Sequence, residues 1–197
     1  MFGLVYTPSS TGRGMTKSMT GSFYLTETIV LPAATLNGAR VSGTIDLSAY
    51  VNVPTGQAVA IEAVDFVHQR GADLGSEVQA FLGGNSGAIT TQLTDLNPGN
   101  AFVRADNHSL VASGSLNIDG PNNVASHQSD IYPDNFGPTN LSEAFLVVND
   151  SLFLTSGPDG FAVGTQDLFI TARVRARVVK LSTKDWMAIA IQSTADQ

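Results

Sequence analysis

From residue 22 onward the sequence consists of short runs rich in β-branched and aromatic residues, each ended by a turn signal. The first three runs are SFYLTETIVL, RVSGTIDLSAY and QAVAIEAVDFVHQ, and they are separated by Pro32, Asn37-Gly38 and Pro54-Thr55-Gly56. Further strands are predicted at 77–82, 87–93, 101–105, 109–117, 143–148, 151–155 and 166–181. About nine or ten strands at this spacing, with no convincing helix before the C-terminal segment, predict an all-β protein. The pattern favours a two-sheet sandwich and, within that class, a single jelly roll.

The run from 58 to 66 is apolar on both of its faces. One face holds Ala58, Ala60, Glu62, Val64 and Phe66, and the other holds Val59, Ile61, Ala63 and Asp65. A strand of this kind is expected to be covered on two sides. Its single glutamate, Glu62, is expected to find a partner in the core or to turn toward an interface.

The chain length of 197 residues fits one domain. Three parts are predicted: an N-terminal arm at 1–21, a β-sandwich at 22–181 and a C-terminal segment at 182–197. The arm carries Arg13 and Lys17 and has no core-forming period, so contacts with neighbouring subunits are expected to hold it. With 43% hydrophobic residues and no Cys, the chain needs no disulfide and offers no thiolate to a metal. Neither a signal peptide nor a membrane span is predicted from its apolar runs.

The segment STKDWMAIAIQS, at 182–193, is predicted to form a short helix. Ser182 stands three residues before Asp185, which is the spacing of a capping box. One helical face would then hold Trp186, Ile189 and Ala190. The alternative is a strand, whose apolar side would hold Met187, Ile189 and Ile191. In both conformations Trp186 is expected to be a packing anchor, because a lone indole among apolar residues is more often buried than used for recognition.

The longest irregular stretch, 118–140, is rich in Asn, Asp, Gly and Pro and is far longer than a hairpin loop. We expect it to be an excursion with a structural or binding purpose. The residues here and just upstream that superficially resemble metal ligands are His127, Asp130, Asp134, Asp106 and His108. They lack a partner at a recognised spacing, so turn capping is the simpler interpretation and no metal site is predicted. Asp159, within SGPDGF, is assigned to a tight turn.

The segment TARVRARVVK puts Arg173, Arg175 and Arg177 on one face of a strand and apolar residues on the other. One interpretation is a solvated edge strand whose charges prevent aggregation. The other is an electropositive strip that contacts either acidic loops of a neighbouring subunit or nucleic-acid phosphates. Of these two partners the subunit is favoured, because no second basic cluster extends a phosphate track.

Charged residues make up only 14% of the chain, and the net charge is −7. Polar but uncharged outer faces can be buried at lower desolvation cost than charged ones, which suits an assembling protein. The chain lacks G-x-S-x-G, H-E-x-x-H, P-loop and G-x-G-x-x-G motifs. A glycosidase would need Glu62 to meet Asp65 or Glu27 as a carboxylate pair. We predict a protein that is not an enzyme and has no cofactor.

An arm, a Cys-free sandwich with long polar loops, a low-charge surface and a C-terminal tail together resemble the single-jelly-roll capsid proteins of small icosahedral viruses. The resemblance is architectural, spans 22–181 by strand count and spacing, and transfers no site residue. It implies a structural, self-assembling major capsid protein that packs with copies of itself, assembled in the host cytoplasm into a virion. The arm departs from many such proteins, because it holds only Arg13 and Lys17 where they have an Arg/Lys-rich segment. Direct condensation of a genome by this arm is therefore not expected.

The alternative function is that of a carbohydrate-binding β-sandwich module. Its candidate stacking residues are Tyr132, Phe136 and Trp186. Sugar platforms usually combine two or three exposed aromatic rings, whereas aromatic residues are 8% of this chain with a single Trp. The capsid interpretation is therefore preferred.

Overall fold

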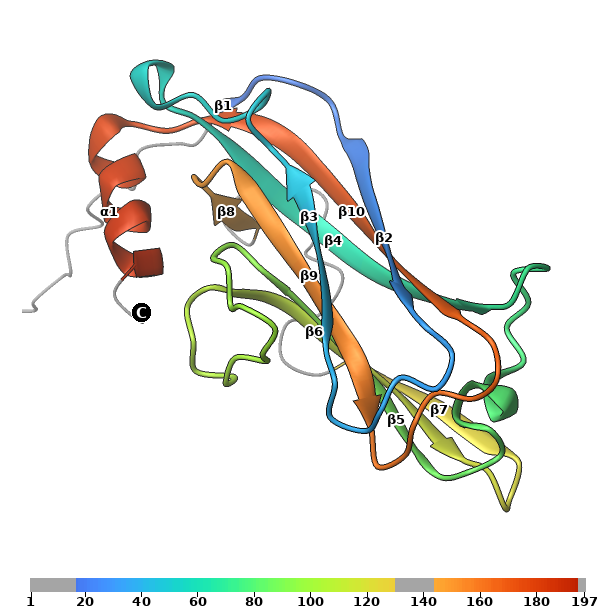
Figure 1. Ribbon diagram of the computed structural model, residues 1–197. Helices are drawn as coiled ribbons and strands as arrows, with labels where there is room; N and C mark the ends of the chain where they lie inside the picture. Colours follow the sequence, from blue (N-terminus) through green and yellow to red (C-terminus); the bar gives the residue numbers. More distant parts are fainter. Residues whose placement is uncertain (1–16, 130–143, 195–197) are drawn as a thin grey trace, which may run out of the picture.

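A computed structural model describes residues 17–129 and 144–194, which form two antiparallel sheets packed face to face (Figure 1). The first sheet contains β1 (Lys17–Ser18), β2 (Phe23–Leu31), β4 (Gln57–Arg70), β8 (Phe145–Val147) and β10 (Leu168–Lys180). The second sheet contains β3 (Val41–Asp46), β5 (Gly87–Thr94), β6 (Leu110–Asp119), β7 (Val124–Ser129) and β9 (Ser151–Asp159). The described residues also include two short 3₁₀ turns, η1 (Val53–Thr55) and η2 (Val78–Leu82), and one helix, α1 (Thr183–Thr194).

The strands pair in a nested order. Strand β2 pairs with β10, β3 with β9, β4 with β8 and β5 with β6, so early strands meet late strands. The first sheet therefore reads β2-β10-β4-β8 and the second reads β3-β9-β5-β6, with β7 added at its edge. This is the order obtained when one long antiparallel hairpin is rolled into two facing sheets, which defines a jelly roll. The predicted all-β jelly-roll sandwich is confirmed.

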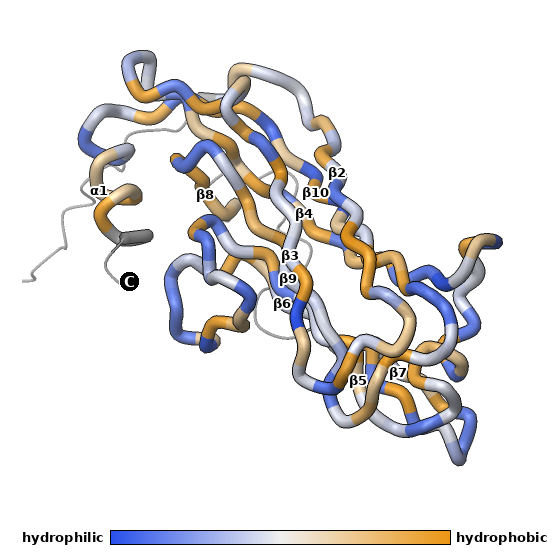
Figure 2. Tube along the Cα trace, viewed as in Figure 1, coloured by the Kyte–Doolittle hydropathy of each residue, from blue (hydrophilic) through white to orange (hydrophobic). Residues whose placement is uncertain are grey.

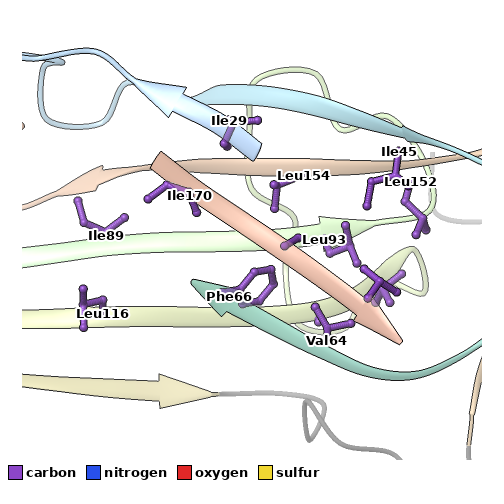
Figure 3. Packing of buried hydrophobic residues seen from close by; sticks show 14 of the residues in the cluster. Ile29, Ile45, Val64, Phe66, Ile89, Leu93, Leu116, Leu152, Leu154 and Ile170 are labelled. Atoms are coloured by element: carbon purple, nitrogen blue, oxygen red, sulfur yellow. The ribbon is translucent and has the colours of Figure 1, made fainter. Parts of the chain in front are cut away.

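The main core lies between the two sheets, where Figure 3 shows side chains from both pointing toward one another. Along β10, Leu168, Ile170, Ala172 and Val174 are buried while the residues between them face outward. Alternation of this kind follows from the two-residue period of a strand with one face on the core. The buried residues that Figure 3 labels are Ile29, Ile45, Val64, Phe66, Ile89, Leu93, Leu116, Leu152, Leu154 and Ile170.

A second, smaller apolar cluster lies on the outer face of the first sheet, beneath α1. The sheet contributes Ala58, Ala60, Val148, Val179 and Leu181, and the helix contributes Trp186, Ile189 and Ala190. The predicted helix and its apolar face are confirmed, and the alternative of a strand is wrong. The N-terminal cap also forms, because Ser182 Oγ donates to Asp185 Oδ2 at 2.7 Å and accepts from Asp185 N at 3.2 Å.

The two apolar faces of β4 have two separate causes. At the start of the strand, Val59 and Ile61 enter the main core while Ala58 and Ala60 lie under α1. Further along, the pairing with β10 skips one residue: Ala176 pairs with Ile61 and Arg175 with Ala63. Glu62 is thus the extra residue of a β-bulge, and beyond it the core positions change from odd to even numbers.

Three expectations about local structure need correction. Residues 78–82 form η2 and not a strand, because their backbone bonds are local: Ala80 N donates to Glu77 O at 3.2 Å and Gly83 N donates to Ala80 O at 3.3 Å. Residues 101–105 are not a strand, because Gln92 Oε1 accepts from Val103 N at 2.9 Å and Gln92 Nε2 donates to Val103 O at 3.0 Å. The range 118–129 is not irregular either, since it forms the β6–β7 hairpin. Residues 130–140 lie outside the described residues.

Candidate interface on the outer face of the first sheet

The predicted arginine strip lies on the outer face of β10, near the middle of the first sheet. Its register partners on β4 are Asp65 for Arg173, Ala63 for Arg175 and Ala60 for Arg177. Arg173 is exposed, whereas Arg175 and Arg177 are only partly exposed. The strand period therefore aligns the three side chains as expected, but their surroundings differ.

Glu62 joins two of these arginines into one cluster. Its side chain is 3% exposed, with Oε2 lying 3.4 Å from Arg175 Nε and Oε1 paired with Arg177 Nη2. Ser22 Oγ donates to Glu62 Oε2 at 2.7 Å. The bulge turns the Glu62 side chain outward, beside the two guanidiniums. A buried carboxylate is costly unless it is paired and hydrogen-bonded, and these contacts meet that requirement. Glu62 is thus partnered on the outer face and not in the main core.

Arg173 has different neighbours. Its guanidinium carbon lies 5.4 Å from the centre of the Tyr24 ring on β2, within the range of a cation–π contact. Asp65, its register partner, is exposed on the same face. The strip is therefore one exposed arginine beside two arginines that share an internal carboxylate. The sequence shows that arginines share a face, but Glu62 is more than a hundred positions away and its pairing could not be foreseen.

Trp186 lies at the contact between α1 and the first sheet. It is partly buried and packs with Ile189 and Ala190 against the cluster that contains Ala58 and Val179. The ring does not stand on an open surface as a sugar-stacking platform would. The other two candidate stacking residues, Tyr132 and Phe136, lie outside the described residues.

Of the carboxylates considered for catalysis, Glu62 and Asp65 both face outward on β4, where Glu62 is already paired with two arginines, whereas Glu27 lies on the other face of the sheet. Glu27 pairs in register with Ala172, while Asp65 pairs with Arg173, the next residue of β10. Adjacent strand residues point to opposite faces, so Glu27 faces the second sheet and Asp65 faces outward. A Cβ added to Gly43 of β3 would lie 2.8 Å from Glu27 Oε1, which agrees with that placement.

The other candidate polar residues have local partners or fall outside the described set. Asp106 forms an exposed ion pair with Arg104 at 3.2 Å. Asp159 ends β9 and does not belong to the turn: its Oδ1 lies 2.5 Å from Arg40 Nη2, and Gly160, with φ 89°, makes the turn. Within the described residues, no three His, Asp or Glu side chains are close enough to hold a metal ion.

His127 belongs to β7, where it pairs in register with Leu116, and Asp130 and Asp134 lie outside the described ranges. The described part of the chain contains no helix long and apolar enough to cross a membrane.

Asp95 is a buried carboxyl group that sequence reasoning missed. Its side chain is 2% exposed just after β5, and burial raises its pKa to about 7. Asn149 Nδ2 donates to Asp95 O at 3.0 Å and to Asp95 Oδ2 at 3.4 Å. Its Oδ1 has no hydrogen-bond partner in the described part of the chain. An aspartate at the end of a strand normally indicates a turn, so the sequence carries no signal of this burial.

The solved structures that resemble this chain include two of viral origin. Merkel cell polyomavirus VP1, solved in complex with GD1a oligosaccharide, is 11% identical, with 83% of this chain and 98% of that chain covered at a TM-score of 0.39. Desmodium yellow mottle tymovirus is 12% identical, with 92% of this chain and 94% of that chain covered at a TM-score of 0.27. Both are viral capsid proteins, the class that the sequence resembles. Likenesses of this strength do not bear on function. No protein-family model and no curated protein matches the sequence.

Proposed function

We propose that this protein is a viral major capsid protein that assembles with copies of itself into an icosahedral shell. The observation that carries the proposal is the nested strand order of the sandwich, β2-β10-β4-β8 facing β3-β9-β5-β6. This jelly-roll order recurs in capsid proteins, and also in lectins and cupins. The proposal therefore rests on fold and on surface, and no reaction site contributes to it.

The low charge of the chain and its exposed apolar side chains favour assembly over the other functions that jelly rolls serve. Charged residues are only 14% of the chain, and ion pairs within the subunit already engage the buried Glu62 and the partly buried Arg40. Large apolar side chains are exposed at several places on the surface, which suits interfaces that have an apolar centre and a polar rim. On the sandwich and its loops they are Met19, Tyr24, Val30, Leu36, Val53, Leu74, Val124 and Phe161.

Within this proposal, three parts of the chain have assigned tasks. The N-terminal arm, 1–21, contributes to assembly, and its last residues already add β1 to the edge of β10. Arg173 is the member of the arginine strip that is exposed enough to meet an acidic group of a neighbouring subunit. Trp186 anchors α1 on the sandwich, which fixes where the C-terminal segment leaves the subunit.

The mass of the purified protein tests the proposal directly. Light scattering coupled to size exclusion, followed by negative-stain microscopy, should find closed particles of many copies at low ionic strength. A monomer of 20.6 kDa at all concentrations and salt conditions would overturn it. Retention of that monomer on a polysaccharide resin would instead favour the carbohydrate-binding alternative.

A further inference from the structure

Helix α1 is apolar on two sides, although only one of them faces the sheet. Trp186, Ile189 and Ala190 pack on the second cluster, whereas Met187 and Ile191 are 55% and 65% exposed. The latter two residues are four positions apart and therefore neighbours on the helix surface. The middle of α1 is hydrophobic in Figure 2. The outward-facing side of a surface helix is normally polar. Met187 and Ile191 therefore form an unusual apolar patch, which a further apolar segment would stabilise by shielding it from water.

The N-terminal segment enters the described structure next to this patch. Lys17 pairs with Lys180 and Ser18 with Val179, three residues before α1 begins. Met19 N donates to Val178 O at 2.9 Å, which extends the attachment by one residue. Because β1 runs antiparallel to β10, the chain that precedes Lys17 points toward Leu181 and the start of α1. Figure 1 shows β1 and α1 at the same end of the molecule.

The residues before Lys17 include large apolar side chains, which suit the apolar patch on α1. The sequence begins MFGLVY, in which Phe2, Leu4, Val5 and Tyr6 are large and apolar, and continues with TPSSTGRGMT at 7–16. A Ser/Thr/Gly-rich connection of about ten residues spans roughly 16 to 19 Å on average. A helix of twelve residues is about 18 Å long, so the connection has the reach to bring MFGLVY alongside Met187 and Ile191.

We propose that residues 2–6 of the same chain pack on the outer side of α1, over Met187 and Ile191. A stable contact between two proteins buries about 800 Å² on each partner, far more than two side chains one turn apart provide. A tethered segment needs less area, because its effective concentration near the patch reaches the millimolar range. The occupant is therefore the chain's own N-terminus and not a second copy. This inference holds whether or not the protein assembles.

Cysteine cross-linking tests the contact, since the chain has no cysteine of its own. The variant Leu4→Cys/Ile191→Cys pairs the N-terminal segment with the patch. The matched control is Leu4→Cys/Val124→Cys, because Val124 is also 55% exposed but lies on β7, at the opposite end of the molecule from α1 (Figure 1). Both full-length variants are oxidised at low protein concentration and followed on non-reducing gels.

The test pair should form a link within one chain at least about tenfold faster than the control pair, as expected for a tethered segment at high effective concentration. Adding Met187→Glu to the test pair should remove that advantage without unfolding the protein, since Met187 is exposed. Equal rates for the two pairs would overturn the inference. A link that joins two chains would also overturn it, because the occupant would then be a neighbouring copy. A monomer in the mass measurement would defeat the proposed function but leave this result unaffected.

Discussion

Glu62 and Asp95 are both buried carboxyl groups, 3% and 2% exposed, but their partners differ. Glu62 meets two guanidiniums and a serine hydroxyl, and neighbours of this kind favour the charged form of a carboxyl group. Asp95 accepts a long hydrogen bond from an asparagine amide, and burial raises its pKa to about 7. The difference teaches that burial by itself does not decide whether a carboxyl is ionised; the charges and donors around it do. Glu62 belongs to a structural ion-pair cluster, whereas Asp95 is a group whose protonation changes near neutral pH.

Removal of the Glu62 charge should have the largest effect. Glu62→Gln leaves Arg175 and Arg177 without their shared carboxylate, and breaking a partly buried pair of this kind typically costs about 3 to 5 kcal/mol. Urea denaturation of the isolated subunit would measure the loss. The control is Glu77→Gln, because Glu77 is exposed and lies 3.7 Å from Arg70, so that change should cost less than about 1 kcal/mol. Similar losses of unfolding free energy in the two variants would mean that the Glu62 cluster stabilises the subunit no more than a surface ion pair does.

Asp95 should make the protein less stable as the pH rises. The folded-state pKa is about 7 and the ordinary value is 3.8, so between these values the unfolded chain ionises Asp95 while the folded chain keeps it protonated. Stability is therefore lost progressively from about pH 4 to pH 7, by an amount on the order of 4 kcal/mol.

Asp95→Asn removes this titration. The variant and the wild type should be similarly stable near pH 4, and the variant should be the more stable at pH 8. Denaturation of both proteins at the two pH values gives the comparison, in which other titrating groups cancel. A stability difference that does not change with pH would show that Asp95 ionises in the folded state as readily as in the unfolded chain.

Trp186→Ala should cost about 2 kcal/mol, roughly half the loss for a fully buried aromatic side chain, since the indole is only partly buried under α1. The matched control on the same helix is Lys184→Ala, whose side chain is exposed and which should cost less than about 1 kcal/mol. Thermal unfolding of both variants tests the difference. If Lys184→Ala proves as costly as Trp186→Ala, the indole does not anchor the helix.

Arg173→Glu should have the smallest effect on folding, under about 1 kcal/mol, because Arg173 is exposed and its cation–π contact with Tyr24 is a surface one. Its effect should instead be on association, which should weaken and should depend on salt as the Debye length falls from about 10 to about 3 Å. Arg177→Glu is the contrast, since it puts a second carboxylate beside Glu62 and should destabilise the subunit itself. Assembly of Arg173→Glu at wild-type levels would make Arg173 a solvated side chain.

Sequence periodicity predicts strands such as β10 well, because one face lies on the core and the side chains alternate accordingly. It predicts the arginine face of β10 and the helix cap at Ser182 for the same reason, since both depend on local spacing. It misplaces 77–82 and 101–105, where tertiary contacts override local preference: Phe81 and Leu82 are buried together, and the Gln92 side chain satisfies the backbone of Val103.

The candidate site depends even more on contacts between distant parts of the chain. The pairing of Glu62 with Arg175 and Arg177 follows from a bulge, and a bulge is set by the register of two strands and not by the composition of either. Asp95 is buried by segments that meet only in the folded chain, including the turn that holds Asn149. Both features involve single polar residues, which leave no periodic trace in the sequence.

The nested strand order also constrains how the polypeptide reaches its native state. Strand β10 lies between β2 and β4 in the first sheet, so this sheet has no centre until residue 180 has been synthesised. Strand β2 can pair only after β10 has been synthesised. The pairing of these two strands closes a loop that contains most of the sequence. Contacts of such long range give slow folding, in the range of milliseconds to seconds. Pairing of the first sheet therefore follows synthesis of β10, and the unpaired edges of β2 and β4 stay open to aggregation until that moment.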